Sequence, residues 1–150
     1  MIDPRTLIGR ELPAFSAKVE RGHLRFFATV LGEIDPTYSD LDAARAAGYP
    51  DLLVPPTFFF SLELGRPNPH GVLQELGVDL RQILHGEQAF EYHALAFAGQ
   101  TLDLAPRYSD YYEKKNGALR FLVRQTHVSR DGEPVATLTN VLVIRELELA

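Results

Sequence analysis

The side chains best suited to chemistry lie in one short acidic loop, residues 32–40, which reads GEIDPTYSD. Glu33 and Asp35 carry carboxylates that could take a proton from a water molecule, as a general base does. Tyr38 follows in the same loop, but a phenol with an ordinary pKa of about 10 is a poor base at neutral pH. The alternative is a structural loop, in which acidic side chains accept hydrogen bonds from turn and helix-cap amides. The sequence leaves both interpretations open.

Two helices are expected to flank this loop. Apolar residues recur at helical spacing over residues 20–31, and Gly32 follows where a helix C-terminus often adopts a left-handed conformation. Ser39 or Asp40 can cap the Ala-rich segment LDAARAAG, which ends at Gly48. The loop is therefore held at both ends by predicted helices.

A third helix is predicted over TFFFSLEL, residues 57–64, which is apolar on nearly every side and ends at Gly65. A helix of that kind must be buried nearly all round. Pro55 and Pro56 end the extended run before it. Residues 66–84 mix proline, glycine and scattered apolar positions, which predicts an overhanging segment with one or two helical turns.

In the second half of the chain the hydrophobic period changes to two, which predicts four strands. They read EQAFEYHALAF, TLDLAPRYSDYY, ALRFLVRQTHVS and PVATLTNVLVIRE. Asn116-Gly117 and Asp131-Gly132 favour tight hairpins, because such turns need positive φ at their central residues. The last three strands are therefore expected to form an antiparallel meander. Helices followed by strands predict one α+β domain over residues 1–150, in which a sheet covers a helix.

Composition narrows the class of protein. A chain of 150 residues, 45% of them hydrophobic and 23% charged, suits one globular domain. It has no cysteine, which excludes thiolate ligands and cysteine nucleophiles, and its histidines lack the spacing of a metal site. The N-terminus has no apolar run, so we expect a cytoplasmic protein that does not interact with membranes. A formal net charge of -5 disfavours nucleic acid as a partner.

Two long segments, GEIDPTYSDLDAARAAGYPDLLVPPTFFF and LHGEQAFEYHALAFAGQTL, resemble the MaoC-like hydratase/dehydratase family. The resemblance is to its N-terminal or non-catalytic subunit type. It implies a single α+β hotdog domain, in which an antiparallel sheet wraps around a long buried helix. It also implies reversible addition of water across the 2,3 double bond of an enoyl thioester, carried on coenzyme A or acyl carrier protein, without a cofactor.

The resemblance also implies which residues stand at the catalytic positions. Catalytic members of the family use an Asp followed five positions later by a His, in a loop reading roughly Gly-Asp-x-Asn-Pro-x-His. In this sequence Glu33 stands at the Asp, Asp35 at the Asn and Tyr38 at the His. The oxyanion glycine before the buried helix matches Pro56, which has no N–H to donate, whereas a shift of one residue would provide the Thr57 amide. The isolated chain is therefore expected to be poorly active.

For substrate binding, the resemblance points to Pro56, Thr57 and Phe58 beside the acyl pocket, and to His85. The same helix can be simple core, and His85 a structural hydrogen-bonding residue. We expect a subunit of an (R)-specific enoyl-thioester hydratase, equivalently a 3-hydroxyacyl-thioester dehydratase, that shapes the acyl pocket for a catalytic MaoC-like partner in a heterodimer. The alternatives are a weakly active homodimeric hydratase that uses Glu33 and Tyr38, a hotdog thioesterase, and a non-enzymatic acyl-thioester binding protein.

Overall fold

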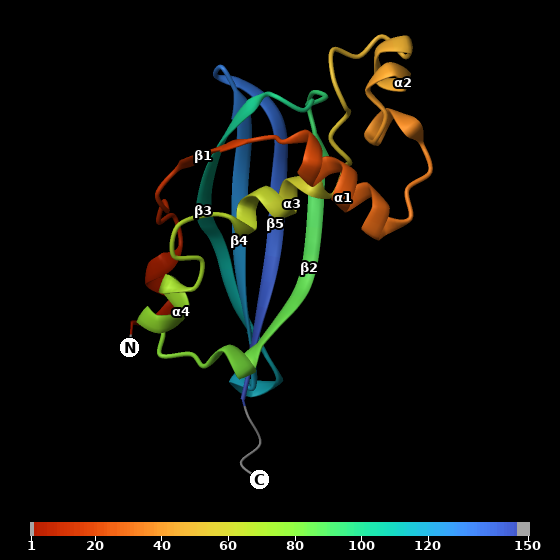
Figure 1. Ribbon diagram of the computed structural model, residues 1–150. Helices are drawn as coiled ribbons and strands as arrows, with labels where there is room; N and C mark the ends of the chain where they lie inside the picture. Colours follow the sequence, from red (N-terminus) through yellow and green to blue (C-terminus); the bar gives the residue numbers. More distant parts are fainter. Residues whose placement is uncertain (1, 147–150) are drawn as a thin grey trace.

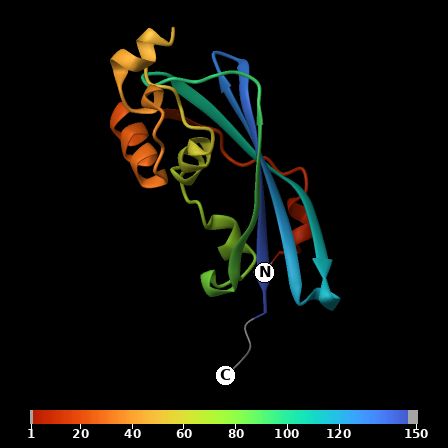
Figure 2. The ribbon, with the colours of Figure 1, turned by 90° about the vertical axis from the view of Figure 1, so that its right-hand side faces the viewer.

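The computed structural model describes residues 2–146, which form one antiparallel sheet with helices on one of its faces (Figures 1 and 2). The strand order is β1-β3-β4-β5-β2. The strands are β1 (Phe15–Lys18), β2 (Ile83–Tyr92), β3 (Thr101–Lys114), β4 (Leu119–Arg130) and β5 (Glu133–Arg145). The helices are α1 (Arg21–Leu31), α2 (Leu41–Ala46), α3 (Phe58–Leu64) and α4 (Gly71–Glu75). The predicted α+β class is confirmed.

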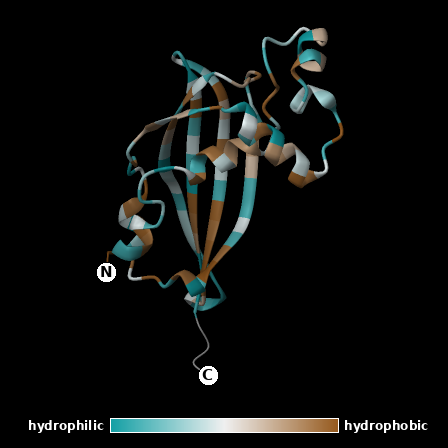
Figure 3. Cartoon of the chain, in the orientation of Figure 1, coloured by the Kyte–Doolittle hydropathy of each residue, from teal (hydrophilic) through white to brown (hydrophobic). Residues whose placement is uncertain are grey.

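The last three strands form the predicted meander, because both predicted turn dipeptides adopt left-handed backbone conformations. Asp131 (φ 51°) and Gly132 (φ 83°) join β4 to β5, and Asn116 (φ 54°) and Gly117 (φ 88°) lie between β3 and β4. Asparagine, aspartate and glycine tolerate such angles better than other residues. The strands alternate in hydropathy along their length, as the bands in Figure 3 show.

The strand predictions differ from the structure in two places. The sequence pattern does not predict β1, because four residues give too short an alternation to recognise. The strand expected over residues 87–97 runs instead from Ile83 to Tyr92. Its expected last residue, Phe97, makes only a single bridge, to Leu53. The chain therefore leaves β2 early and packs against the segment that leads into α3.

The central helix α3 crosses the face of the sheet (Figure 1). Phe58, Phe59 and Leu62 are buried in the main apolar core. The helix has seven residues, so it is shorter than the long helix that the resemblance implies. The expectation that it is buried nearly all round is wrong for Leu64, which is 57% exposed. This side of α3 is open in the single chain.

Both helices beside the acidic loop form near the predicted bounds, although α2 ends at Ala46, two residues before the predicted stop at Gly48. Gly32 has a φ of 69° and ends α1 in the left-handed conformation. Asp40, the second of the two candidate caps, accepts hydrogen bonds from the amides of Asp42 and Ala43 at the start of α2. The loop is therefore fixed by a cap at each end.

The predicted overhanging segment contains α4 and a short 3-10 turn, Leu80–Gln82. It packs on the sheet through a second apolar cluster, separate from the core around α3. The buried members of that cluster are Leu7, Val72, Leu73, Leu76, Tyr108, Leu122 and Ile144.

The two long edges of the sheet differ. Beyond β1, the edge of β3 is covered by the N-terminal segment: Gly9 N–H donates to Tyr108 O (2.9 Å), Tyr108 N–H to Arg10 O (3.1 Å) and Leu12 N–H to Pro106 O (2.9 Å). At the opposite edge, β2 pairs with β5 on one side, and its other side has no strand partner within residues 2–146. An open edge strand of ten residues is a template for pairing with another chain.

Candidate active site

The acidic loop forms a compact turn whose carboxylates bind the turn's own donors. Asp35 Oδ1 accepts hydrogen bonds from the Thr37 amide (2.9 Å) and the Thr37 hydroxyl (2.8 Å). These bonds lower the pKa of Asp35 below its ordinary value. Glu33 Oε1 accepts from the Asp35 amide (3.0 Å). Both carboxylates are exposed. Their hydrogen bonds are those expected of a structural loop, which is one of the two interpretations that the sequence allows.

Tyr38 is the loop residue that reaches a cavity. Its side chain is half-buried, and its pKa is raised first by burial and then by the negative charges of Glu33 and Asp35. A phenol in these surroundings stays protonated at neutral pH and can donate a hydrogen bond. It cannot take the place of a histidine as a general base.

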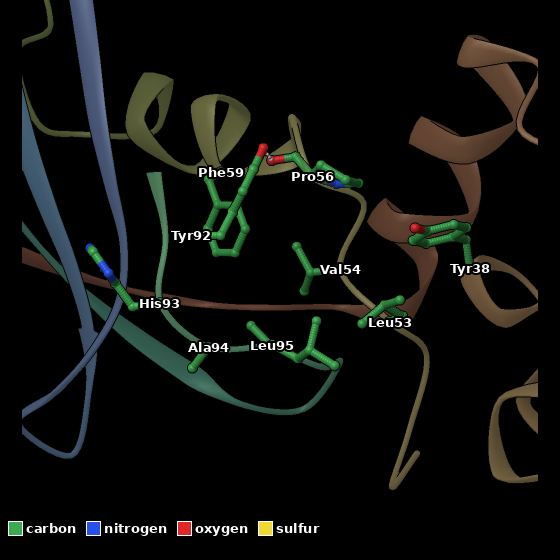
Figure 4. Close-up of a pocket in the computed structure, with 10 residues that line it drawn as sticks. Tyr38, Leu53, Val54, Pro56, Phe59, Tyr92, His93, Ala94 and Leu95 are labelled. Carbon is green, nitrogen blue, oxygen red and sulfur yellow. Dashed lines mark hydrogen bonds between the residues drawn. The ribbon is translucent and has the colours of Figure 1, made fainter. Parts of the chain in front are cut away.

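The cavity beside Tyr38 has a volume of about 390 Å³, within the usual range for small-molecule sites (Figure 4). Most of its lining is apolar, and the polar groups are few. The lining residues are Tyr38, Leu53, Val54, Pro56, Phe59, Tyr92, His93, Ala94, Leu95 and Ala96. This lining suits an apolar chain that carries a small number of hydrogen-bonding groups.

The start of α3 forms part of the cavity wall. Pro56 is exposed and offers a carbonyl, which accepts a hydrogen bond from the Tyr92 hydroxyl (2.9 Å). The next residue, Thr57, is exposed, and its amide donates no hydrogen bond to any residue from 2 to 146. A donor for a substrate oxygen is therefore available here only if the match to the family is shifted by one residue.

Sequence reasoning missed Tyr92. It appeared only as one member of an alternating strand, with nothing to distinguish it from a core aromatic residue. In the structure it is 48% exposed, its ring stacks on Phe90 (5.9 Å between centroids), and burial raises its pKa. Tyr92 thus brings a second neutral phenol to the cavity, next to the start of α3.

The remaining predicted site residues lie elsewhere. Phe58 packs edge-on against Phe27 (5.2 Å) and borders a different groove, between α1 and α3. His85 lies at the other end of β2, where its Nε2 is 2.8 Å from the Asn140 side-chain amide and its ring is 4.9 Å from that of Phe60. The structure therefore brings Tyr38 and Pro56 together, with Glu33 and Asp35 on the adjoining loop, and keeps Phe58 and His85 apart from them.

Glu63 is a further polar residue that sequence reasoning missed, because TFFFSLEL was interpreted as apolar. Its side chain is only 1% exposed and points from α3 to the sheet, where Oε1 accepts hydrogen bonds from Arg124 Nε (2.8 Å) and from the Thr126 hydroxyl. The available signal was a glutamate in an apolar helix together with an arginine at a buried strand position. This ion pair fastens the helix to β4.

The described residues contain neither a candidate metal-binding cluster nor a candidate membrane-spanning helix. Residues 2–146 hold no cluster of three or more His, Cys, Asp or Glu residues that could bind a metal ion. None of the helices described is both long and apolar enough to cross a membrane.

Comparison with known proteins gives matches over nearly the whole chain. A family model described as "FAS1-like, dehydratase domain region" matches residues 6–138. A UPF0336 protein of Saccharopolyspora erythraea is 36% identical over 143 residues, which cover 94% of this chain and 90% of that protein. A UPF0336 protein of Streptomyces coelicolor is 31% identical over 147 residues, covering 97% of each.

Solved structures show the same fold at lower identity. A MaoC-like dehydratase has a TM-score of 0.81 at 21% identity, covering 95% of this chain and 43% of that one. The ChsH1-ChsH2 complex from Mycobacterium tuberculosis scores 0.75 at 18% identity, with 95% and 94% covered. The HadBC (3R-hydroxyacyl-ACP dehydratase) complex from the same organism scores 0.70 at 23%, with 89% and 92% covered. The predicted hotdog fold and the resemblance to MaoC-like proteins are confirmed.

Proposed function

Because the chain belongs to the FAS1-like dehydratase-region family and has the MaoC-like hotdog fold, we propose that it is the pocket-shaping subunit of an enoyl-thioester hydratase. The reverse reaction is dehydration of a 3-hydroxyacyl thioester. In this proposal a second MaoC-like chain supplies the catalytic Asp and His. The observation that supports it is the cavity of about 390 Å³, whose lining has Tyr38 and Pro56 at positions where a base and an amide donor are needed.

The apolar walls would hold the acyl chain and exclude water from it. Leu53, Val54 and Phe59 are buried, so they form a rigid surface rather than an adaptable one. Tyr38 keeps its proton at neutral pH and is suited to donate a hydrogen bond to a substrate oxygen, whereas the Tyr92 hydroxyl already donates its proton to the Pro56 carbonyl. Hydration needs a base for the attacking water and donors for the thioester oxygen; this chain offers a donor but no well-placed base.

The proposed substrate is an enoyl thioester on coenzyme A or acyl carrier protein, in the cytoplasm. The structural neighbour HadBC is named as a 3R-hydroxyacyl-ACP dehydratase, which supports this substrate class and the R configuration. The mainly apolar lining supports an acyl group as the part that enters the cavity.

The proposed partner would bind along the open edge of β2. Large apolar side chains are exposed there and on the adjoining helix, which is unusual for a surface that stays in water. Leu64 of α3 is 57% exposed and Leu84 of β2 is 45% exposed. Two of the structural neighbours are complexes of two chains, ChsH1-ChsH2 and HadBC, which supports a partner of the same kind. We expect at least a dimer in light scattering at micromolar concentration, and a clean monomer would count against a site shared between subunits.

The decisive experiment measures hydration of crotonyl and longer enoyl thioesters by this chain, by a MaoC-like chain that retains Asp-x4-His, and by their mixture. We expect the isolated chain to be nearly inactive and the mixture to be the most active. Leu95→Trp should fill the cavity and raise the KM for long substrates. Ile8→Trp is the matched control, since Ile8 is also an exposed apolar residue (43%) but lies outside the cavity lining. Equal kinetics for the two variants would argue against this cavity as the acyl site.

One alternative has some support in the geometry. The free amide of Thr57 could serve an oxyanion, which favours a weakly active homodimer that uses Glu33, with Asp35 positioning the water and Tyr38 assisting. Robust turnover by the purified chain, abolished by Glu33→Gln, would establish that reading instead. Product analysis tests the two remaining alternatives. Release of the free acid would indicate a thioesterase. Binding of the thioester without formation of free acid or 3-hydroxyacyl thioester would indicate a non-enzymatic acyl-thioester binding protein.

A further inference from the structure

A second polar site lies on the other side of α3, around its buried charges. Glu63 on the helix is bound by Arg124 and Thr126 of β4, and its second oxygen, Oε2, has no hydrogen-bond partner in the described part of the chain. A second guanidinium, of Arg66, stands 3.9 Å from Glu63 Oε1. The side chains of Arg124 and Arg66 are only 10% and 11% exposed.

The charges in this cluster do not balance. Two arginines share one glutamate, and the closer contact belongs to Arg124. Arg66 donates to the Pro69 carbonyl (2.6 Å), which is a neutral group. Its pKa is lowered, first by burial and then by repulsion from Arg124. Buried charges in proteins are normally paired, so Arg66 is a cation in need of an anion.

Arg66 opens onto a hollow of about 210 Å³ between the N-terminal segment, α4 and β3. The hollow has no lining residue in common with the cavity beside Tyr38. Its polar lining includes Tyr108, which is 2% exposed and whose pKa is raised by burial, so that its phenol remains a donor. Its apolar walls are Leu12, Pro13, Pro67, Pro69 and Val72.

The other charged groups of the hollow neutralise each other. Arg10 donates two hydrogen bonds to Glu75, from Nη1 to Oε2 (2.6 Å) and from Nη2 to Oε1 (3.0 Å). The Glu75 carboxylate stands in the lining and would repel an anion, but its charge is already matched by Arg10. The lining therefore carries one positive charge in excess, and that charge is on Arg66.

We propose that this hollow binds a small oxyanion, the carboxylate or phosphate group of a small molecule, with Arg66 as its anchoring donor. A guanidinium matches both groups through two parallel hydrogen bonds. The Tyr108 hydroxyl and the Asn68 amide line the same hollow and are the further donors, while the proline and leucine walls surround a short carbon body. The site does not depend on the hydratase proposal, because it is formed by different residues.

The test uses the full chain and two simple probes, inorganic phosphate and butyrate, with chloride at equal ionic strength as the reference. Calorimetry should detect binding of at least one probe, and that probe should raise the melting temperature more than chloride does. Arg66→Met should weaken the affinity by roughly 30-fold or more, because it removes the charged partner of a buried pair. Arg81→Met is the control: Arg81 is 78% exposed and pairs only with Asp79 among the described residues. It should bind as the wild type does.

A second variant covers the case in which Arg66→Met fails to fold. Pro67 is exposed and forms one wall of the hollow, so Pro67→Trp should fill it while leaving the buried cluster intact. We expect normal melting without probe and loss of binding with it. The proposal is overturned if neither probe binds better than chloride. That result would mean that Arg66 donates a hydrogen bond to Glu63 Oε2 and needs no other anion. It is also overturned if Arg66→Met or Pro67→Trp binds as tightly as the wild type.

Discussion

The acidic loop of residues 32–40 and the buried cluster around Glu63 contain similar groups in opposite surroundings. In the loop, exposed carboxylates accept hydrogen bonds from donors two positions away. In the cluster, Glu63 is bound by Arg124, which lies 61 positions further along the chain, and almost no water reaches it. The loop is conspicuous in the sequence but is held by weak local contacts. The cluster gives only a weak signal in the sequence, and it holds the helix to the sheet.

The largest expected effect is on stability, at Glu63. Glu63→Leu would leave Arg124 buried without its counter-ion and should lower the free energy of unfolding by about 3–5 kcal/mol, measured by urea denaturation. In the loop, Glu33→Leu should change it by less than about 0.5 kcal/mol.

A double variant separates charge from packing at the same place. Glu63→Leu with Arg124→Met removes the closer ion pair and should recover part of the lost stability, because apolar groups of similar volume often replace a buried pair without penalty, although Arg66 stays buried without its carboxylate. No recovery would mean that the helix depends on the polar contacts themselves. Equal losses for Glu63→Leu and Glu33→Leu would remove the contrast between the two regions.

The second effect is on rate and concerns the loop. Glu33→Asp with Asp35→Asn and Tyr38→His would restore the acid/base pattern of catalytic relatives but leave Pro56 without an N–H. Adding Pro56→Gly should raise enoyl-thioester hydration by a further factor of roughly 10² to 10³, the usual value of one oxyanion donor. Circular dichroism checks that α3 survives the change.

The outcomes of this repair have distinct meanings. A triple variant that already matches a competent hydratase would show that the oxyanion donor is not at Pro56 and that the free Thr57 amide fulfils that role. Two folded but inactive variants would mean that the pocket of this chain works only as a wall for its partner.

The third effect is smaller and concerns the cavity wall. Tyr92→Phe removes the hydrogen bond from the phenol to the Pro56 carbonyl (2.9 Å) and should cost about 1 kcal/mol of stability. Tyr112→Phe is the control, because its ring stacks on Phe121 (4.7 Å) far along β3 and its hydroxyl donates no hydrogen bond within residues 2–146. If the two variants unfold at the same denaturant concentration, the bond between β2 and the start of α3 contributes nothing measurable.

Much of the fold could be predicted because its signals are local. The turn residues Asn116 and Asp131, the left-handed Gly32 and the cap at Asp40 each act within a few positions of the chain. Strand β1 could not be predicted, because its four residues become a strand only through pairing with β3, far along the sequence. Local interactions therefore determine where these turns and helix caps lie, whereas β1 depends on contacts between residues far apart in the sequence.

The candidate site divides in the same way. The loop and the helix start were found because the surrounding segments resemble the family, and the resemblance assigns Tyr38 and Pro56 to the positions of its His and its oxyanion Gly. Tyr92 and Glu63 were not found, because their roles depend on what lies opposite them in space. Phe58 and His85 show the converse: the resemblance assigns both to substrate binding, but Phe58 on α3 and His85 on β2 border separate hollows.

The smallest effect tests whether the loop is held by charge at all. Hydrogen bonds from Thr37 lower the pKa of Asp35 in the folded chain, so its ionised form stabilises the fold above the unfolded-state pKa. That stabilisation is lost as pH falls through the folded pKa. Asp35→Asn keeps an acceptor oxygen but not the charge, so it should melt slightly below the wild type at pH 7, and the difference should vanish well below about pH 4. Glu91→Gln, at an exposed position on β2 whose side chain makes no hydrogen bond in the described chain, should show no such difference. A deficit for Asp35→Asn that persists in acid would mean that the turn depends on side-chain shape rather than on charge, and the loop would then resemble the cluster around Glu63 even less.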